Sequence, residues 1–173
     1  GKISTLVQTG TSNINKVYTY SGNTIIVNAT YAAAFFSRDS ITLDNSGKPL
    51  NIRQYWDDAN TLYTNFALEY NGDKLLKYQE TTNVSSTPKT VTLTNTNGNT
   101  TKIQSPTDIV NMEYHTDKAI QKGDFLEFSS LLQYGVPLYK NKNLVKTINF
   151  GGSNITNYNY EFNSDELISK ITA

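Results

Sequence analysis

LYTNFALEYNGDKLL, residues 62–76, is the stretch that decides the fold of this chain. Its first nine residues alternate, with Leu, Thr, Phe, Leu and Tyr at the even positions and Tyr, Asn, Ala and Glu between them. A period of two residues is typical of a strand with one covered face. Asn71-Gly72 then offers two residues that readily adopt positive φ, so residues 75–80 are expected to return as the second strand of a hairpin.

The same short phrase occurs four times along the chain. It consists of an aromatic residue, two small or polar residues, an Asp or Asn, a spacer and two apolar positions. By first residue and expected turn, the copies are Tyr20 (turn near 20–24), Tyr70 (70–74), Tyr114 (114–118) and Phe162 (162–166). Recurrence at roughly 45–50 residues indicates a repeated hairpin unit, and we expect one β domain over residues 1–173.

Strands joined by tight turns pair with each other, so the sequence predicts about ten to twelve antiparallel strands in meander order. A sheet this wide twists, which favours a barrel or half-barrel; a β-sandwich is the alternative. Residues 81–89, which end in a Ser/Thr/Pro cluster, are expected to form a long loop. Ser105-Pro106-Thr107-Asp108 is expected to cap a single helical turn at residues 109–112. No segment carries the sustained 3.6-residue period of a long helix.

Composition narrows the function classes. Fifteen basic and fifteen acidic residues cancel, and they are scattered singly, so the chain lacks the basic field that holds nucleic acid. Because there is no cysteine, disulfides, zinc–thiolate sites and thiol nucleophiles are excluded. The 21 Asn and 23 Thr suit the turns and the half-buried strands of an all-β protein.

The residues that could carry chemistry are few. His115 is the only histidine, but it occupies the first turn position of the third copy, where a polar side chain suffices. Asp57-Asp58 follows Trp56 in a polar loop, where adjacent aspartates usually cap turns. No calcium loop, phosphate loop or metalloprotease helix is present, so we expect no catalytic residue, metal or cofactor.

Aromatic residues are the candidate ligand-binding groups. Tyr55 and Trp56 are consecutive, so one should face the core and the other solvent. Tyr63 lies on the side of its strand opposite to the covered face. Exposed rings on a flat sheet can stack on sugars or on a partner protein. The alternative is that they pack on a second covered face or stiffen the sheet.

The repeated phrase resembles the YD-type hairpin of RHS-like surface proteins. It is more similar still to uncharacterised Bacteroidetes lipoproteins and exported proteins, as in YEFNSDELISKI at residues 160–171. The chain departs from the YD pattern because it lacks the later Gly and has His115-Thr116 in the third copy. The resemblance implies export and attachment at the outer membrane or cell surface, and it assigns no activity.

These observations favour a non-enzymatic, extracytoplasmic module of a bacterial surface protein that binds a glycan or a protein, or has a structural role. We expect it in the periplasm or at the outer-membrane surface, with any lipid anchor upstream of residue 1. Two alternatives stay open: a glycan-acting hydrolase, and a barrel that carries a small apolar ligand. An open sheet whose edges pair with neighbouring subunits is a third reading.

Overall fold

A computed structural model describes residues 2–9, 13–121 and 124–173. Twelve strands of this described part form one antiparallel sheet, two more form a separate hairpin, and there is one helix, α1 (Phe125–Tyr134). The strands of the large sheet are β1 (Thr5–Gln8), β2 (Ile14–Ser21), β3 (Thr24–Tyr31), β4 (Ala34–Leu43), β5 (Pro49–Tyr55), β6 (Tyr63–Asn71), β7 (Lys74–Thr82), β8 (Ser85–Thr96), β9 (Asn99–Gln104), β10 (Ile109–Ala119), β11 (Asn143–Asn149) and β12 (Ile155–Asn157). The small sheet consists of β13 (Asn159–Phe162) and β14 (Ile168–Thr172).

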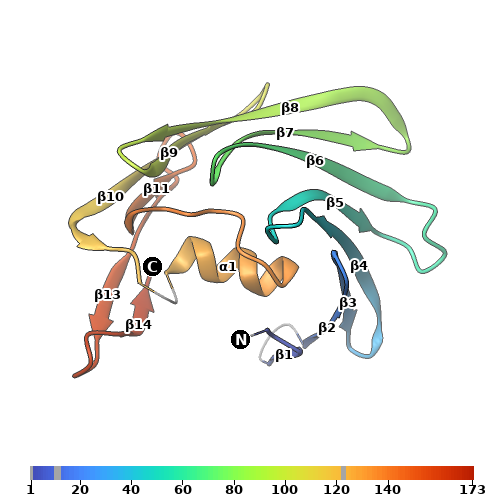
Figure 1. Cartoon of the computed structure of the whole chain (residues 1–173), viewed down its shortest axis with the longest axis horizontal. Coiled ribbons are helices and arrows are strands. Elements are labelled where there is room, and N and C mark those ends of the chain that lie inside the picture. The colour runs from blue at the N-terminus through green and yellow to red at the C-terminus, as the bar shows by residue number, and fades with distance from the viewer. Residues whose placement is uncertain (1, 10–12, 122–123) are drawn as a thin grey trace. The chain divides into compact units, whose positions relative to one another are not determined.

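The strands follow each other in the sheet in the order of the chain, from β1 to β12 (Figure 1). The expectation of an all-β antiparallel meander is therefore confirmed. The sheet is not closed into a barrel, because its order ends at β1 and β12 in the described part of the chain. These two strands have four and three residues, so each offers few backbone groups for closing the sheet.

Three of the four repeated phrases turn where the sequence indicates. Gly22 lies between β2 and β3 with φ 53°, and Gly72 lies between β6 and β7 with φ 55°. Glu166, with φ 59°, lies in the turn between β13 and β14. The prediction of a turn at residues 114–118 is wrong, because these residues lie within β10. That copy offers no Gly or Asn for positive φ; instead, the pairing of β10 with β11 shifts register there.

Two other local expectations are also corrected. The segment 81–89, expected as a loop, belongs mostly to β7 and β8, which a short turn joins at Asn83-Val84. Residues 109–112 begin β10 and are not helical. The Ser105–Asp108 segment is a tight turn between β9 and β10, in which the Ser105 amide donates to the Asp108 carbonyl (2.9 Å).

No described helix is long and apolar enough to cross a membrane.

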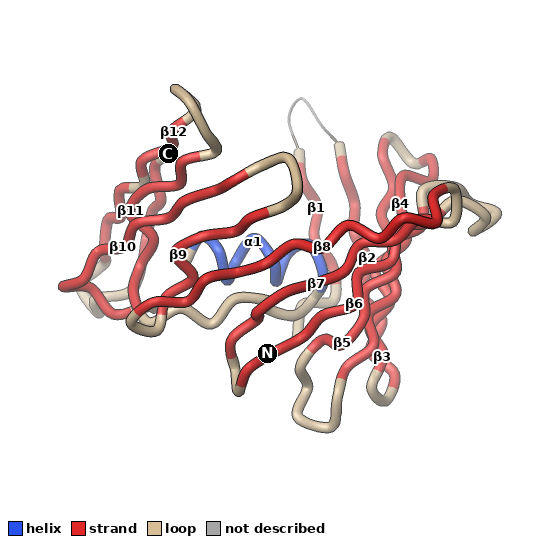
Figure 2. Tube along the Cα trace, turned by 90° about the horizontal axis from the view of Figure 1, so that it is seen from above, coloured by secondary structure: helices blue, strands red, loops and turns tan. Residues whose placement is uncertain are grey.

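Contacts between residues divide the chain into two compact units. Unit 1 consists of Gly1–Glu69, Tyr78–Lys89 and Leu131–Val136, and unit 2 consists of Tyr70–Lys77, Thr90–Ser130 and Pro137–Ala173. In unit 1, β2 to β5 lie side by side (Figure 2). Alternate positions on one side of these strands form its core, which contains Ile25, Val27, Ala29, Ile41 and Ile52.

The last turn of α1 belongs to unit 1, where side chains of β2 satisfy its free carbonyls. The Tyr18 hydroxyl donates to the Leu132 carbonyl, and the Tyr20 hydroxyl donates to the Gly135 carbonyl (3.2 Å). The Lys16 ammonium also reaches the Leu132 carbonyl (3.4 Å). Carbonyls at a helix C-terminus have no partner within the helix, so these bonds fix the end of α1.

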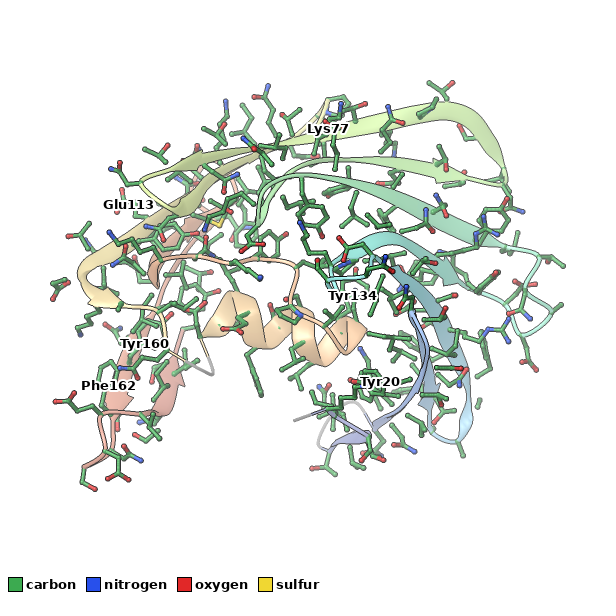
Figure 3. The ribbon with its side chains drawn as sticks, viewed as in Figure 1. Tyr20, Lys77, Glu113, Tyr134, Tyr160 and Phe162 are labelled. Atoms are coloured by element: carbon green, nitrogen blue, oxygen red, sulfur yellow. The ribbon has the colours of Figure 1, made fainter. Side chains whose placement is uncertain are left out.

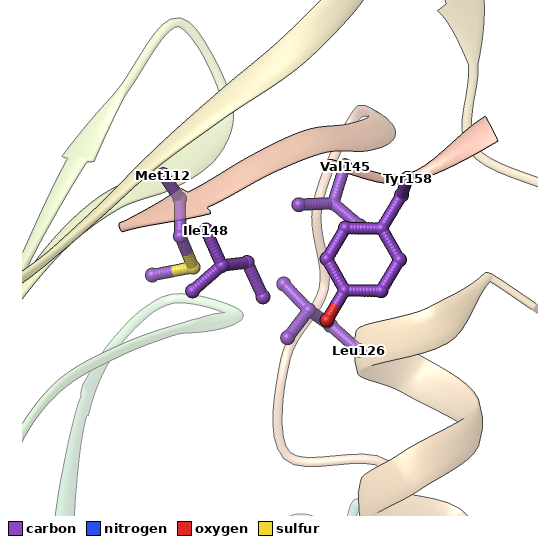
Figure 4. Close-up of a cluster of buried hydrophobic side chains, with 5 residues drawn as sticks. All are labelled: Met112, Leu126, Val145, Ile148 and Tyr158. Carbon is purple, nitrogen blue, oxygen red and sulfur yellow. The ribbon is translucent and has the colours of Figure 1, made fainter. Parts of the chain in front are cut away.

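In unit 2, the start of α1 is fixed by Asp124, which is fully buried. Its carboxylate accepts from the Leu126 amide (3.2 Å), as an N-cap does, and also from the Val145 amide (3.4 Å). The Tyr160 hydroxyl donates to the same carboxylate (3.4 Å), and burial raises the pKa of Asp124. Beside this cap lies the core of unit 2, formed by Met112, Leu126, Val145, Ile148 and Tyr158 (Figure 4).

Candidate functional site

Tyr55 and Tyr63 lie directly opposite each other on β5 and β6. Their ring centroids are 6.1 Å apart and the planes meet at 65°, an edge-to-face arrangement. Both rings are partly exposed. Two of the three aromatic residues singled out in the sequence are therefore brought together as one cross-strand pair.

An arginine covers each of these rings. The Arg38 guanidinium carbon lies 5.0 Å from the centroid of the Tyr55 ring, and that of Arg53 lies 4.7 Å from the centroid of the Tyr63 ring. Arg53 Nε also donates to Asn65 Oδ1 (3.4 Å). A cation over an exposed aromatic ring is worth about 0.5–1 kcal/mol, so the rings hold the guanidinium groups in place.

These residues belong to one side of β3 to β6, which we name the Arg–Tyr face. The strand registers place its twelve residues in three rows: Asn28, Arg38, Tyr55 and Tyr63; Ile26, Ser40, Arg53 and Asn65; Thr24, Thr42, Asn51 and Ala67. The opposite side of the same strands carries the buried residues Ile25, Ile41 and Ile52. The Arg–Tyr face is therefore the side turned away from the core of unit 1.

The Arg–Tyr face is positively charged. None of its twelve residues is acidic, although Glu69 follows Ala67 on the same side of β6. The face holds both arginines of the whole chain, and the other thirteen basic residues are lysines. A guanidinium presents planar N–H donors that match the oxygens of carboxylate, sulfate or phosphate groups. The face can therefore bind an extended ligand that carries negative charge and has apolar surface for the tyrosine rings.

Trp56 lies on the other side of the sheet. Its indole nitrogen donates to Thr64 Oγ1 (3.2 Å), and Thr64 alternates with Tyr63 and Asn65 along β6. The side chain is 49% exposed, so Trp56 is accessible without belonging to the Arg–Tyr face. Tyr55 and Trp56 thus point to opposite sides, as consecutive strand residues do.

The other two candidates from the sequence, Asp57 and His115, contact residues of their own loop or of a neighbouring strand. Asp57 accepts from the Leu62 amide (2.7 Å) and the Thr61 amide (3.1 Å), so it organises its own loop. Hydrogen bonds, that from the Thr61 hydroxyl first, lower the pKa of Asp57. His115 lies edge-on to Tyr160, which is labelled on β13 in Figure 3, with ring centroids 6.0 Å apart. Its Nε2 is buried, and no hydrogen-bond partner lies among the described residues.

Unit 2 contains an open cavity of about 730 Å³, lined by both polar and apolar groups, near the tip of the β8–β9 hairpin. It is lined by a single carboxylate, that of Glu113, and does not include His115. Hydrolysis of a glycosidic bond by the usual mechanism uses two carboxyl groups, so the cavity lacks that pair. Across the described residues, no three His, Asp or Glu side chains are grouped as a metal site would require.

The sequence alone did not identify Arg38, Arg53 and Asn65 as neighbours of the tyrosines. Arg53 and Asn65 were accessible to sequence reasoning, because each lies two residues from a tyrosine on the same strand and therefore on the same side. Arg38 was not, because its position opposite Tyr55 depends on the register between β4 and β5.

Comparisons with known proteins give a fold relationship. No protein-family model and no curated protein matches the sequence, so the resemblance to YD-repeat proteins has no support from either comparison. Among solved structures, the chain is similar to a porin-like protein from Bacteroides uniformis, with a TM-score of 0.66 and 14% sequence identity. The match covers 91% of this chain and 69% of that protein. At this identity, the similarity shows a shared β fold.

Proposed function

We propose that this chain is an extracytoplasmic, non-enzymatic module of a bacterial surface protein and that its Arg–Tyr face binds an anionic polysaccharide. The observation that carries the proposal is that the only two arginines of the chain lie over two paired tyrosines on one face of the sheet. Arginines scattered for solubility alone would have no reason to gather on these rings.

Support for the location comes from two sources. The first is that the chain shares its fold with the porin-like protein from Bacteroides uniformis. The composition of the Arg–Tyr face favours an aqueous setting for this side of the sheet. An arginine on the lipid-facing side of a membrane strand costs about 2–4 kcal/mol at mid-bilayer.

The Arg–Tyr face is better suited to binding an extended glycan than to hydrolysing one or to carrying a small apolar ligand. The twelve residues of the face include no pair of carboxylates and no histidine to act as acid and base. It is an array of donors and rings spread over neighbouring paired strands, which suits an extended chain lying across several strands. Uronate or sulfate groups would pair with Arg38 and Arg53, and sugar rings would contact the exposed parts of Tyr55 and Tyr63.

The test compares two polymers with the same backbone. We expect polygalacturonate to bind, and its fully methyl-esterified form to bind at least tenfold more weakly because its carboxylates are neutralised. The double variant Arg38→Gln/Arg53→Gln should bind polygalacturonate roughly tenfold more weakly, which corresponds to about 1.4 kcal/mol. Isothermal titration calorimetry at two salt concentrations measures both effects.

The matched control is Lys146→Gln/Lys170→Gln, which removes the same charge from unit 2 and should leave binding unchanged. Heparin is included as a sulfated polymer. Equal binding of polygalacturonate by wild type and the arginine variant contradicts the proposal, and so does failure to bind either anionic polymer.

A further inference from the structure

The strands β9 and β10 pair over only part of their length. Their register runs from Gln104 opposite Ile109 to Lys102 opposite Asn111, although both strands continue beyond these residues. The cavity of about 730 Å³ in unit 2 lies along these continuations, with Thr101 of β9 and Tyr114 of β10 among its lining residues. The opening therefore results from the separation of two neighbouring strands.

Buried amides hold one end of this opening in place. Asn99 Oδ1 accepts from the backbone amides of Lys142 (2.8 Å) and Asn143 (2.9 Å), and Asn99 Nδ2 donates to Asn143 Oδ1 (3.0 Å). Asn143 Nδ2 in turn donates to the carbonyls of Thr116 (3.3 Å) and Lys118 (3.0 Å). Asn99 and Asn143 are 5% and 7% exposed. These bonds link β9, β10 and β11 where the ladder itself is interrupted.

Tyr114 bridges the gap between the separated strands. Its hydroxyl donates to the Thr100 carbonyl on β9 (2.6 Å), so the ring is fixed at the cavity wall beside Met112. Lys74 adds a further restraint, because its ammonium donates to the Gly98 carbonyl at the hairpin tip (2.7 Å). The cavity walls are thus preformed, which reduces the entropy cost of binding a ligand.

The lining combines hydroxyl, amide and charged groups with an apolar surface of similar extent. The lining includes the threonines Thr96, Thr101 and Thr116, and its charged residues are Glu113, labelled on β10 in Figure 3, and Lys142. The hydroxyls of Thr96 and Thr101 lie 3.2 Å apart and share a hydrogen bond, so a sugar hydroxyl would join or replace that bond. A sugar ring has the complementary chemistry: hydroxyls that both donate and accept around its edge, and C–H groups on its faces. The volume lies within the roughly 300–1,000 Å³ typical of small-ligand sites.

We propose that this cavity binds one or two residues of a neutral saccharide. The Glu113 carboxylate accepts from sugar hydroxyls, the Lys142 ammonium donates to them, and the Tyr114 ring packs against a sugar face. Because Glu113 and Lys142 carry opposite charges, the lining gives no net preference for an anion. The site differs in this respect from the Arg–Tyr face and does not depend on it.

The experiment is a nuclear magnetic resonance titration of the labelled protein with maltose, cellobiose, lactose and N-acetylglucosamine. We expect at least one of these sugars to shift the backbone amide signals of Thr101, Thr116 and Asn143 in a saturable manner. The variant Thr101→Val/Thr116→Val keeps the side-chain shapes and removes two hydroxyls, so the affinity should fall roughly tenfold. Glu113→Gln should also weaken binding, and it offers a second variant if the valine variant folds poorly.

The Arg38→Gln/Arg53→Gln variant is the matched control, because its sugar affinity should equal that of the wild type. Unshifted cavity signals with all four sugars overturn the proposal, as does equal affinity of the wild type, the valine variant and Glu113→Gln. Cavity shifts caused by a Gly-Ser-Gly peptide and by none of the sugars also overturn it, in favour of a peptide site. Each result is distinguishable from the polygalacturonate test, which reports on unit 1.

Discussion

Asp39 is a buried carboxylate on the core side of β4, only 3% exposed, and its Oδ1 has no hydrogen-bond partner among the described residues. Burial raises its pKa from 3.8 to about 6, while Lys16 and a hydrogen bond from Gln54 oppose the increase. Between these two pKa values, the folded chain binds a proton that the unfolded chain has released. Stability from this group is therefore greatest below about pH 4 and is lost as the pH rises through 6.

Asp39→Asn should consequently stabilise the protein at pH 7, where the wild type buries a charge. A shift from 3.8 to about 6 corresponds to roughly 3 kcal/mol at most, and we expect a gain of about 2 kcal/mol. Urea unfolding of both proteins at several pH values between 4 and 7 measures it. A gain that stays constant from pH 4 to pH 7 would show that the ionisation of Asp39 is not responsible.

At the scale of elements, the end of α1 depends on a glycine. Gly135 has φ +74°, and a Cβ atom there would lie 3.0 Å from both Tyr18 Cδ1 and Tyr20 Oη. Those tyrosines donate to the carbonyl of Leu132 in the last turn of the helix and to that of Gly135 directly after it. Gly135→Ala therefore combines backbone strain with displacement of the contact to β2, and we expect it to cost about 2–3 kcal/mol of stability.

Gly22→Ala is the control for backbone strain alone. Gly22 also has positive φ (+53°), but no atom lies within 4 Å of the position a Cβ would take. We expect a cost of about 1 kcal/mol there. Thermal and urea unfolding of the two variants give the comparison, and equal losses would mean that the contact between Gly135 and β2 adds nothing to stability.

Sequence reasoning was reliable for elements in which a single residue type has a decisive backbone preference. Gly22 and Gly72 supply positive φ, and the hairpins around them are present. The third copy shares the spacing of the phrase but not such a residue, and it forms part of a strand. The helix α1 was not predicted. Its ten residues, FLEFSSLLQY, contain too few turns for a clear helical period, and the single N-cap residue Asp124 is too weak a signal on its own.

The candidate site could be anticipated along a strand but not across strands. Alternation places Tyr63 and Asn65 on one side of β6, and the same rule pairs Tyr55 with Arg53 on β5. The register between strands is set by side-chain packing and by irregularities such as the shift between Thr42 and Leu43. No local motif encodes such a shift, so the sequence alone could not place Arg38 over Tyr55.

At the scale of the whole molecule, the net charge of zero conceals an uneven use of the two basic residue types. Composition disfavours a large basic field, yet it gives no sign that both arginines share one sheet face. The all-β meander, in contrast, followed from the spacing of turn residues over the whole chain. Patterns that repeat along the sequence were thus easier to interpret than a cluster built from single residues.

The edges of the large sheet lead to a prediction about association. In the described part of the chain, the sheet ends at β1 and β12, and so short an edge gives another copy little backbone to pair with. We expect this chain to remain monomeric over a hundredfold range of concentration. Sedimentation velocity measures this, and an association that grows with concentration would favour the alternative in which sheet edges join neighbouring subunits.

The sequential strand order also affects how quickly the chain reaches its native state. Each ladder in the large sheet joins segments that are neighbours along the polypeptide, so most pairings close a short loop and lose little chain entropy. Rates of folding among small proteins rise as native contacts become more local. This protein should therefore acquire its structure faster than a Greek-key protein of equal length, and a hairpin formed early can act as the template on which its neighbours assemble.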